Sequence, residues 1–516
     1  MSILGIWELK KIAMRNLARH KTKTILTCAA IMVSVAVYIF VSSWLGGMAI
    51  ESRRNIVNFE MGAALLQTNE YFEKRDEMPS YETFMNWEIY REALSREGYV
   101  STPRYTFAGT LISTSGSAPI MIYAVDPVGE REVFRYVPYV DFGRYPEDGR
   151  FEIALGTVAA EKLKVGIPTR PFRQELEELI AVTANNQSDA NFIRSLYSLV
   201  IPATGIFAVQ EEIVAGNERM ILNRDASKAD LDRYWDLLAV AGRNNVRITT
   251  TIDVKDERGN VANIYQILDV VVSGVINCPA PLPNGNTAYI PLSALQDETG
   301  MMLFGAVTEL IIRERGVPDT RLPGASESSA AITAALQSGL QSMGRQLPDD
   351  LGIRTWDEYM AEYLGYEAVQ TGAPQVMIFF LLLLSFLGIS NTILLAILER
   401  TREIGMMRAM GMTNGQMTIT YMLETGFLGF IGSILGIILG CIINYPVVKY
   451  GFDFIAMAEI LEGGIGFRTT GIFRSVWNIP VIIGTGIIAT LLSSCIAFFP
   501  IRKALKMQIT ESLRFE

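Results

Sequence analysis

The chain has 516 residues, of which 50% are hydrophobic and 19% charged, and its formal net charge at pH 7 is −9. This length exceeds one ordinary domain, and the composition excludes a disordered or fibrous protein. The acidic balance gives no support for nucleic-acid binding. Three of the four cysteines, Cys28, Cys441 and Cys495, lie in apolar runs, which leaves no intramolecular disulfide framework.

Residues 1–23 predict an amphipathic helix that lies at a membrane surface, because their apolar residues recur on one helical face. Six Lys and Arg residues precede the first long apolar run, which predicts that the N-terminus is cytoplasmic. The only histidine, His20, has no co-ligands for a metal or catalytic role. We therefore expect an interfacial helix here and no metal site.

Four charge-free apolar runs each suffice to cross a bilayer as a helix. The predicted spans are residues 24–47, 376–398, 418–448 and 479–501. Residues 105–125 and 270–296 are also charge-free, but polar and turn-forming residues interrupt them, so we expect strands there. Four spans return the tail, residues 502–516, to the cytoplasm. Residues 48–372 and the loop 449–477 are then expected on the outer side.

The large segment 48–372 predicts an α+β domain. Residues 149–166 indicate a strand, a tight turn at Gly156 and a short helix, and further strands are expected over 246–254, 261–276, 288–292 and 310–312. Helical patterns at 173–182, 190–199 and 226–243 predict a helical insertion over about 168–245, to which we assign no chemical role. Acidic pairs such as Glu51 and Glu60 are interpreted as solvated.

Three further elements complete this segment. A helix is expected over 326–345, with Ser326 as its cap, and another helix over 349–366 leads back to the membrane. Residues 279–286, P-A-P-L-P-N-G-N, predict a turn or protruding loop, because Pro, Gly and Asn are turn formers.

The sequence of residues 399–416 predicts a short helix between the second and third spans. Ile404, Met407 and Met410 recur at helical spacing with charged residues around them, Gly411 is a natural stop, and Thr413 or Asn414 can cap the next helix. A methionine-rich surface flanked by charges suits docking onto a protein partner. The plainer alternative is a positively charged anchor on the cytoplasmic side.

The third span contains an acid and a glycine series. Glu424 needs a partner or a place near the interface, because an acid inside the bilayer is costly. Gly432, Gly436 and Gly440 form two overlapping G-x-x-x-G units and predict close helix packing, either within one protomer or across a dimer.

Sequence motifs for catalysis are absent. The chain contains no G-x-x-x-x-G-K-[ST], no C-x-x-C and no H-E-x-x-H. We therefore expect no enzyme activity and no bound cofactor in this chain.

The run E-R-T-R-E-I-G-M-M-R-A-M-G at 399–411 resembles the coupling-helix signature of the FtsX/MacB/LolC-type permeases, the type VII (mechanotransmission) subunits of ABC transporters. Residues 124–132, A-V-D-P-V-G-E-R-E, and 149–166 also resemble the outer domains of this family, and 500–514 resembles its closing tail, although Thr510 stands in place of the usual proline. The positions that the resemblance assigns to coupling are Arg400, Arg402, Glu403, Ile404, Gly405, Met407, Arg408 and Gly411.

The resemblance implies an α-helical membrane protein with four transmembrane helices plus a large α+β extracytoplasmic domain, a MacB-like periplasmic core, between helices 1 and 2. It also implies a multi-pass protein of the inner membrane with both termini cytoplasmic and the large domain periplasmic. The expected partners are a cytoplasmic ABC ATPase dimer that holds ATP and Mg, a second permease subunit, membrane lipids, and a periplasmic carrier or adaptor.

Three functions compete within this family: release of lipoproteins from the membrane, MacB-like export of peptides, toxins or drugs, and FtsX-like regulation of cell-wall hydrolases. MacB-type permeases commonly carry a fused N-terminal ATPase, so the short segment before the first span favours a LolC/LolE-like lipoprotein-releasing permease. A sensor or adhesin without transport remains the alternative from another class if no ATPase binds. The predicted substrate cavity has apolar walls from the first two spans, namely Val41, Trp44, Leu45, Met48, Val376, Phe379 and Phe380. The turn 279–286 would contact the carrier, or be a plain loop.

Overall fold

The computed structural model describes residues 21–165, 172–196, 200–202, 212–215, 218–221, 224–255, 261–299, 305–451 and 473–506. The predicted interfacial helix before residue 21, most of the loop 449–477 and the tail after residue 506 lie outside these residues. The described chain forms two compact units. The helical unit lies within residues 1–51, 362–453 and 472–516, and the sheet unit mainly within 52–361.

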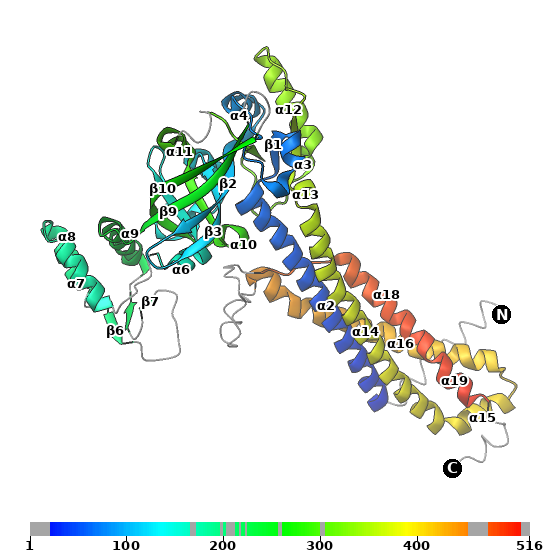
Figure 1. Ribbon diagram of the computed structural model, residues 1–516. Coiled ribbons are helices and arrows are strands. Elements are labelled where there is room, and N and C mark those ends of the chain that lie inside the picture. The colour runs from blue at the N-terminus through cyan, green and yellow to red at the C-terminus, as the bar shows by residue number, and fades with distance from the viewer. Residues whose placement is uncertain are drawn as a thin grey trace. The chain divides into compact units, whose positions relative to one another are not determined.

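Four long apolar helices build the helical unit, as predicted (Figure 1). They are α2 (Lys21–Ile56), α14 (Ala361–Glu399), α16 (Asn414–Tyr450) and α18 (Ile479–Ile496). The short helices α15 (Thr401–Ala409) and α19 (Phe498–Ala504) complete the unit. All four long helices have the length and apolar composition to cross a bilayer, in which a helix satisfies its own backbone hydrogen bonds.

The helices extend beyond the predicted spans. Helix α14 begins at Ala361 rather than near residue 376 and contains Pro374, and α16 contains Pro446. A helix rises about 1.5 Å per residue, so the 36 residues of α2 measure about 54 Å, well above the roughly 30 Å of a bilayer core.

Side chains from all four long helices meet in one apolar core, which includes Val35 of α2, Phe386 of α14, Tyr421 of α16 and Ala489 of α18. Large apolar residues on the opposite faces of these helices, such as Phe380 and Ile487, are exposed. That distribution suits helices whose outer faces contact lipid.

A ten-stranded mixed sheet forms the second unit, in the order β13-β1-β12-β2-β3-β11-β5-β10-β4. Strand β9 pairs with both β10 and β2, so β2, β3, β11, β5, β10 and β9 close into a ring. The strands are β1 (Ala64–Thr68), β2 (Tyr99–Ile112), β3 (Ser117–Val125), β4 (Val140–Gly143), β5 (Glu152–Gly156), β9 (Asn245–Lys255), β10 (Val261–Ile276), β11 (Thr287–Pro291), β12 (Glu309–Glu314) and β13 (Leu351–Thr355).

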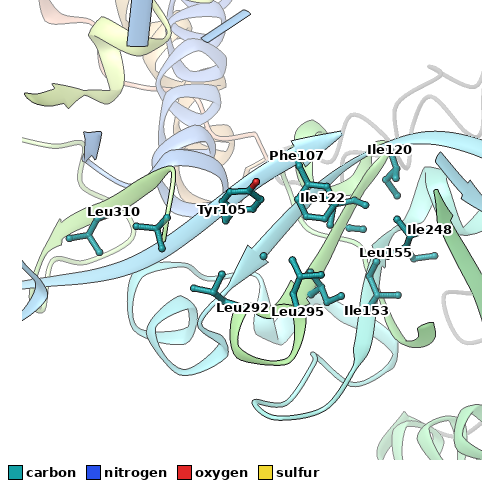
Figure 2. Packing of buried hydrophobic residues seen from close by; sticks show 14 of the residues in the cluster. Tyr105, Phe107, Ile120, Ile122, Ile153, Leu155, Ile248, Leu292, Leu295 and Leu310 are labelled. Atoms are coloured by element: carbon teal, nitrogen blue, oxygen red, sulfur yellow. The ribbon is translucent and has the colours of Figure 1, made fainter. Parts of the chain in front are cut away.

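The two faces of the sheet carry separate cores because successive residues of a strand point to opposite sides. One core contains Phe107, Ile122, Ile153 and Ile248, and Figure 2 shows these side chains together with Leu295 of α11 (Leu292–Thr299). The elements with side chains in or against this core also include α4 (Trp87–Arg96), α6 (Thr157–Leu163) and α12 (Ser329–Ser342).

The opposite core contains Phe59, Val133 and Phe134, with Tyr359 packed against it. Several short elements complete the sheet unit. These are η1 (Val57–Met61), α3 (Asn69–Glu73), η2 (Arg75–Glu77), α5 (Pro127–Val133), η3 (Val137–Tyr139), α10 (Pro281–Asn284), η5 (Ala325–Glu327) and α13 (Trp356–Tyr359). The π-helix η1 directly continues α2, so the first membrane helix runs on into the sheet unit along the chain.

Several predicted details differ from the structure. The insertion has the helices α7 (Phe172–Val182), α8 (Gln187–Leu196) and α9 (Arg224–Val240), but it also has a three-stranded sheet. Its strands are β6 (Val200–Pro202), β7 (Glu212–Ala215) and β8 (Glu218–Ile221). These strands are too short for their periodicity to stand out in the sequence.

Three other expectations need correction. Ser328 rather than Ser326 caps α12, because its hydroxyl accepts from the backbone N–H of Ala331. Residues 351–355 form strand β13 rather than helix. Residues 281–284 of the expected turn form the short helix α10, in which Leu282 is exposed and Asn284 is buried. The Asn284 side chain hydrogen-bonds both backbone groups of Cys278.

Candidate functional site

Helix α15 joins the second and third membrane helices and presents two different faces. Ile404 is 1% exposed and packs into the core of the helical unit, and Thr401 is also buried. Met406 and Met410 are 46% and 80% exposed, and Arg402 is exposed on the same side. Because Arg402, Met406 and Met410 recur every four residues, they form one exposed face, which we call the coupling face.

The chain reverses directly after this helix. Gly411 has φ +97°, a conformation that L side chains rarely adopt. Thr413 then caps α16 in a capping box with Gln416, with the Gln416 N–H donating to the Thr413 hydroxyl at 3.3 Å. The reversal is therefore fixed on both sides, and the coupling face is held in a defined place on the helical unit.

A buried ion pair anchors the start of α15. The guanidinium of Arg400 lies 3.0 Å from the carboxylate of Glu424 in α16, and the two side chains are 11% and 10% exposed. Breaking such a pair by removing one partner typically costs about 3–5 kcal/mol, because the other charge stays buried. The acid in the third span thus has the partner that its position requires.

The structure changes the interpretation of several predicted coupling residues. Arg400 is committed to Glu424, and Ile404 and Gly405 are buried inside the unit, so these three do not belong to the exposed face. Glu403, Met407 and Arg408 are half-buried, whereas Arg402 and Gly411 are exposed. Met406 was missed, although its spacing of four residues from both Arg402 and Met410 is visible in the sequence.

The structure places the three predicted packing glycines against the first membrane helix of the same chain. A Cβ on Gly436 would lie 2.7 Å from the Cβ of Val35, and one on Gly432 would lie 2.9 Å from the Cβ of Ile31. One on Gly440 would meet the backbone of Ala36 at 3.3 Å. Glycine at these positions lets α16 approach α2 closely.

A polar contact that sequence reasoning missed lies near the other end of α16. Asn444 is fully buried, accepts from the Ser475 hydroxyl at 2.6 Å and donates to the Val476 carbonyl at 3.3 Å. The N–H of Val476 donates to the carbonyl of Ser43 in α2. These bonds tie the segment before α18 to both α2 and α16.

The residues predicted to line the substrate cavity are exposed or half-buried in the structure. Val376 and Phe380 are exposed and Phe379 is half-buried, as are the four predicted residues of α2. A cavity of about 550 Å³ in this unit lies elsewhere, beside Thr418, Met422 and Phe498. The cavity between the first two spans therefore stays a prediction.

Comparison with known proteins relates the helical segment that contains α15 to a family of permeases. Residues 375–509 match the family described as FtsX-like permease C-terminal, and the match covers most of α14 and all of α15, α16, α18 and α19. The uncharacterized ABC transporter permease MJ1507 of Methanocaldococcus jannaschii is 31% identical over 136 residues, which are 26% of this chain and 30% of that protein.

Two further relatives carry more specific names. The macrolide export ATP-binding/permease protein MacB of Chlorobaculum tepidum is 28% identical over 130 residues, 25% of this chain and 17% of that protein. The lipoprotein-releasing system transmembrane protein LolC of Neisseria meningitidis is 24% identical over 196 residues, 37% of this chain and 44% of that protein. Each match thus spans less than half of the relative.

Among solved structures, the periplasmic region of MacB from Actinobacillus actinomycetemcomitans aligns with 59% of this chain and 92% of its own length, at 10% identity and a TM-score of 0.28.

Proposed function

We propose that this chain is the permease subunit of an ABC transporter and that a separate cytoplasmic ATPase, which binds ATP and Mg, acts on it through the coupling face. The observation that carries the proposal is the exposed, methionine-rich face of α15, held by a fixed reversal in a segment that matches an FtsX-like permease. Methionine side chains adapt to a partner surface, and Arg402 adds a charged contact.

The contacts of α15 suggest how a displacement of this helix by the ATPase would be transmitted to the other helices. The buried face of α15 and the Arg400–Glu424 pair connect the helix to α16, and the glycines of α16 touch α2. Helix α2 continues to Ile56 and then into η1 of the sheet unit. Displacement of α15 would therefore act on a continuous set of helices that ends in the sheet unit.

The proposal is tested by co-purification of the full chain with the ATPase from the source cells. The variant Met406→Asp/Met410→Asp places two charges on the coupling face and should remove the ATPase. Met85→Asp introduces a charge at an exposed methionine of the sheet unit and should retain it. Equal recovery of a P-loop ATPase with all three proteins would exclude the coupling face as the interface, and recovery with none would exclude the ABC class.

For the substrate, we propose release of lipid-anchored proteins from the outer leaflet of the membrane, with the sheet unit on the outer side, both termini in the cytoplasm and a second permease subunit beside it. The name of the LolC relative describes lipoprotein release. Each buried CH₂ holds an acyl chain in the membrane by about 0.8 kcal/mol, so release needs an input of work.

Macrolide export is the competing activity, since it is the one named for the MacB relative. Proteoliposomes that contain the chain, its ATPase and a fluorescent triacylated peptide distinguish the two. ATP-dependent transfer of the peptide to a soluble acceptor supports lipoprotein release. ATP-dependent movement of a macrolide without release of the peptide would replace this proposal by export.

A further inference from the structure

The helical unit contains a cavity of about 550 Å³ that the proposed coupling mechanism does not use. It lies between the first turns of α16 and the helix α19, together with the two residues that follow α19. Its size falls in the range of about 300–1,000 Å³ that is usual for small-molecule sites. We call it the basic cavity, because Arg502 and Lys506 line it.

The two ends of the basic cavity differ in polarity. The Ser494 hydroxyl of α18 donates to the carbonyl of Met422 at 3.0 Å, and from there the chain continues through α19 towards the start of α16. Phe498 therefore lies at the same end of the cavity as Met422. Arg502 and Lys506 come later in the chain and lie at the end formed by the start of α16.

The apolar end belongs to the membrane-spanning part of both helices. Ile419, Met422 and Phe498 fall within Asn414–Tyr450 and Ile479–Ala504, the two stretches with the length and composition to cross a bilayer. Phe430 follows Ile419 after about three turns, on the same face of α16, and is 49% exposed. An apolar surface thus continues from the cavity along the lipid-facing side of α16.

The basic end carries positive charge without an acid to balance it. Both Arg502 and Lys506 are exposed, and neither has an acidic partner within the part of the chain that the structure describes. The guanidinium carbon of Arg502 lies 4.7 Å from the centre of the Phe498 ring, so this side chain is held against the cavity wall. Glu424, the acid of α16, is paired with Arg400 and does not line the cavity. Two like charges that share one cavity favour an anion between them.

This combination matches an anionic phospholipid better than a free anion. Arginine and lysine form strong, charge-assisted hydrogen bonds with phosphate oxygens, and basic pockets between membrane helices bind anionic headgroups. A free phosphate ion would leave the apolar end of the cavity without a ligand. We propose that the basic cavity binds an anionic phospholipid, with its phosphate at Arg502 and Lys506 and the first part of an acyl chain against Ile419, Met422 and Phe498.

The location gives this binding a structural consequence. The lipid would contact both α16 and α19, and α16 begins directly after the reversal at Gly411 that follows α15. Binding to the folded protein should therefore stabilise the helical unit and raise its melting temperature. Because such binding needs no ATPase, it can hold or fail independently of the proposed function.

The test titrates dioctanoyl phosphatidylglycerol into the purified full chain in a neutral detergent. Native mass spectrometry counts the bound lipid, and the melting temperature is the second readout. Dioctanoyl phosphatidylcholine, which has the same chains and no net charge, and sodium phosphate are the matched titrants. We expect saturable binding of phosphatidylglycerol, binding of phosphatidylcholine that is weaker by tenfold or more, and no binding of phosphate over the same concentrations.

Two double variants with the same change in net charge locate the site. Arg502→Gln/Lys506→Gln should weaken the binding of phosphatidylglycerol by roughly 30-fold, which corresponds to about 2 kcal/mol at about 1 kcal/mol for each basic residue. Arg402→Gln/Lys503→Gln removes two exposed basic residues of the same unit that do not line the cavity, and it should bind like the wild type.

A third variant tests the apolar end and keeps the test decisive if the first double variant does not fold. Met422→Trp fills the cavity, leaves every charge in place and should weaken the binding of phosphatidylglycerol by tenfold or more. Binding that is equal in the wild type and Met422→Trp, or equally weakened in both double variants, would overturn the proposal. Equal binding of phosphatidylcholine, saturable binding of phosphate alone, or no saturable binding would also overturn it.

Discussion

At the scale of single residues, the pairing of Arg400 with Glu424 decides which residues are available to a partner. Arg400→Met should lower the free energy of unfolding by about 3–5 kcal/mol, because Glu424 would keep its burial and lose its counter-charge. The double variant Arg400→Met/Glu424→Leu should recover most of the loss. Thermal melts in detergent measure both, and additive effects of the two substitutions would contradict the pairing.

Glu130 makes stability depend on pH. Burial raises its pKa from 4.5 to about 7, although Arg104 opposes this shift, so the fold favours the protonated carboxyl. The stabilisation is complete below pH 4.5 and is lost as the pH rises through about 7. The effect is a few kcal/mol at most, since one pKa unit corresponds to about 1.4 kcal/mol.

The melting temperature of the chain should therefore fall between pH 5 and pH 8. Glu130→Gln should make that fall smaller but not remove it, because burial also raises the pKa of Glu60 to about 7. Glu92→Gln, with an exposed acid, is the control and should keep the wild-type slope. An unchanged slope in Glu130→Gln would show that other groups dominate the pH dependence.

The sequence could not reveal this cluster of charged residues. Glu60 was interpreted as solvated, and nothing near Arg104, Glu130 or Glu309 marks them as neighbours. Arg104 and Glu309 meet only because β2 and β12 pair in that register. The one local sign that Glu60 is buried is its position in the sequence. It follows Val57 and Phe59 in a helix that continues from an apolar span.

At the scale of elements, the contact between α16 and α2 is the most sensitive to side-chain size. Gly436→Leu would bring a Cβ within 2.7 Å of the Val35 Cβ and should cost about 1–3 kcal/mol through overpacking. Gly484→Leu is the matched control, because a Cβ on Gly484 meets nothing within 4 Å. Equal melting temperatures for both variants would show that the glycines do not limit helix approach.

Elements with strong local signals were predictable from the sequence. The four apolar helices, the strand and helix around Gly156, and the stop at Gly411 follow from composition and turn chemistry. The orientation of α15 was not predictable, because its apolar residues surround the helix. Burial of Ile404 and exposure of Met406 were settled by packing against α16 and its neighbours. The closure of the ring by β9 depends on long-range pairing and has no local signal.

At the scale of the whole molecule, the proposed function places the input of work at the coupling face and its output at the sheet unit. The most direct measurement is the ATP hydrolysis rate of the partner ATPase, reconstituted in proteoliposomes with the wild-type chain, with Met406→Asp/Met410→Asp and with Met85→Asp. We predict that wild type and Met85→Asp change the rate to the same extent, and that the double variant leaves it at the value of the ATPase alone. A rate that responds equally to all three chains would contradict coupling through this face.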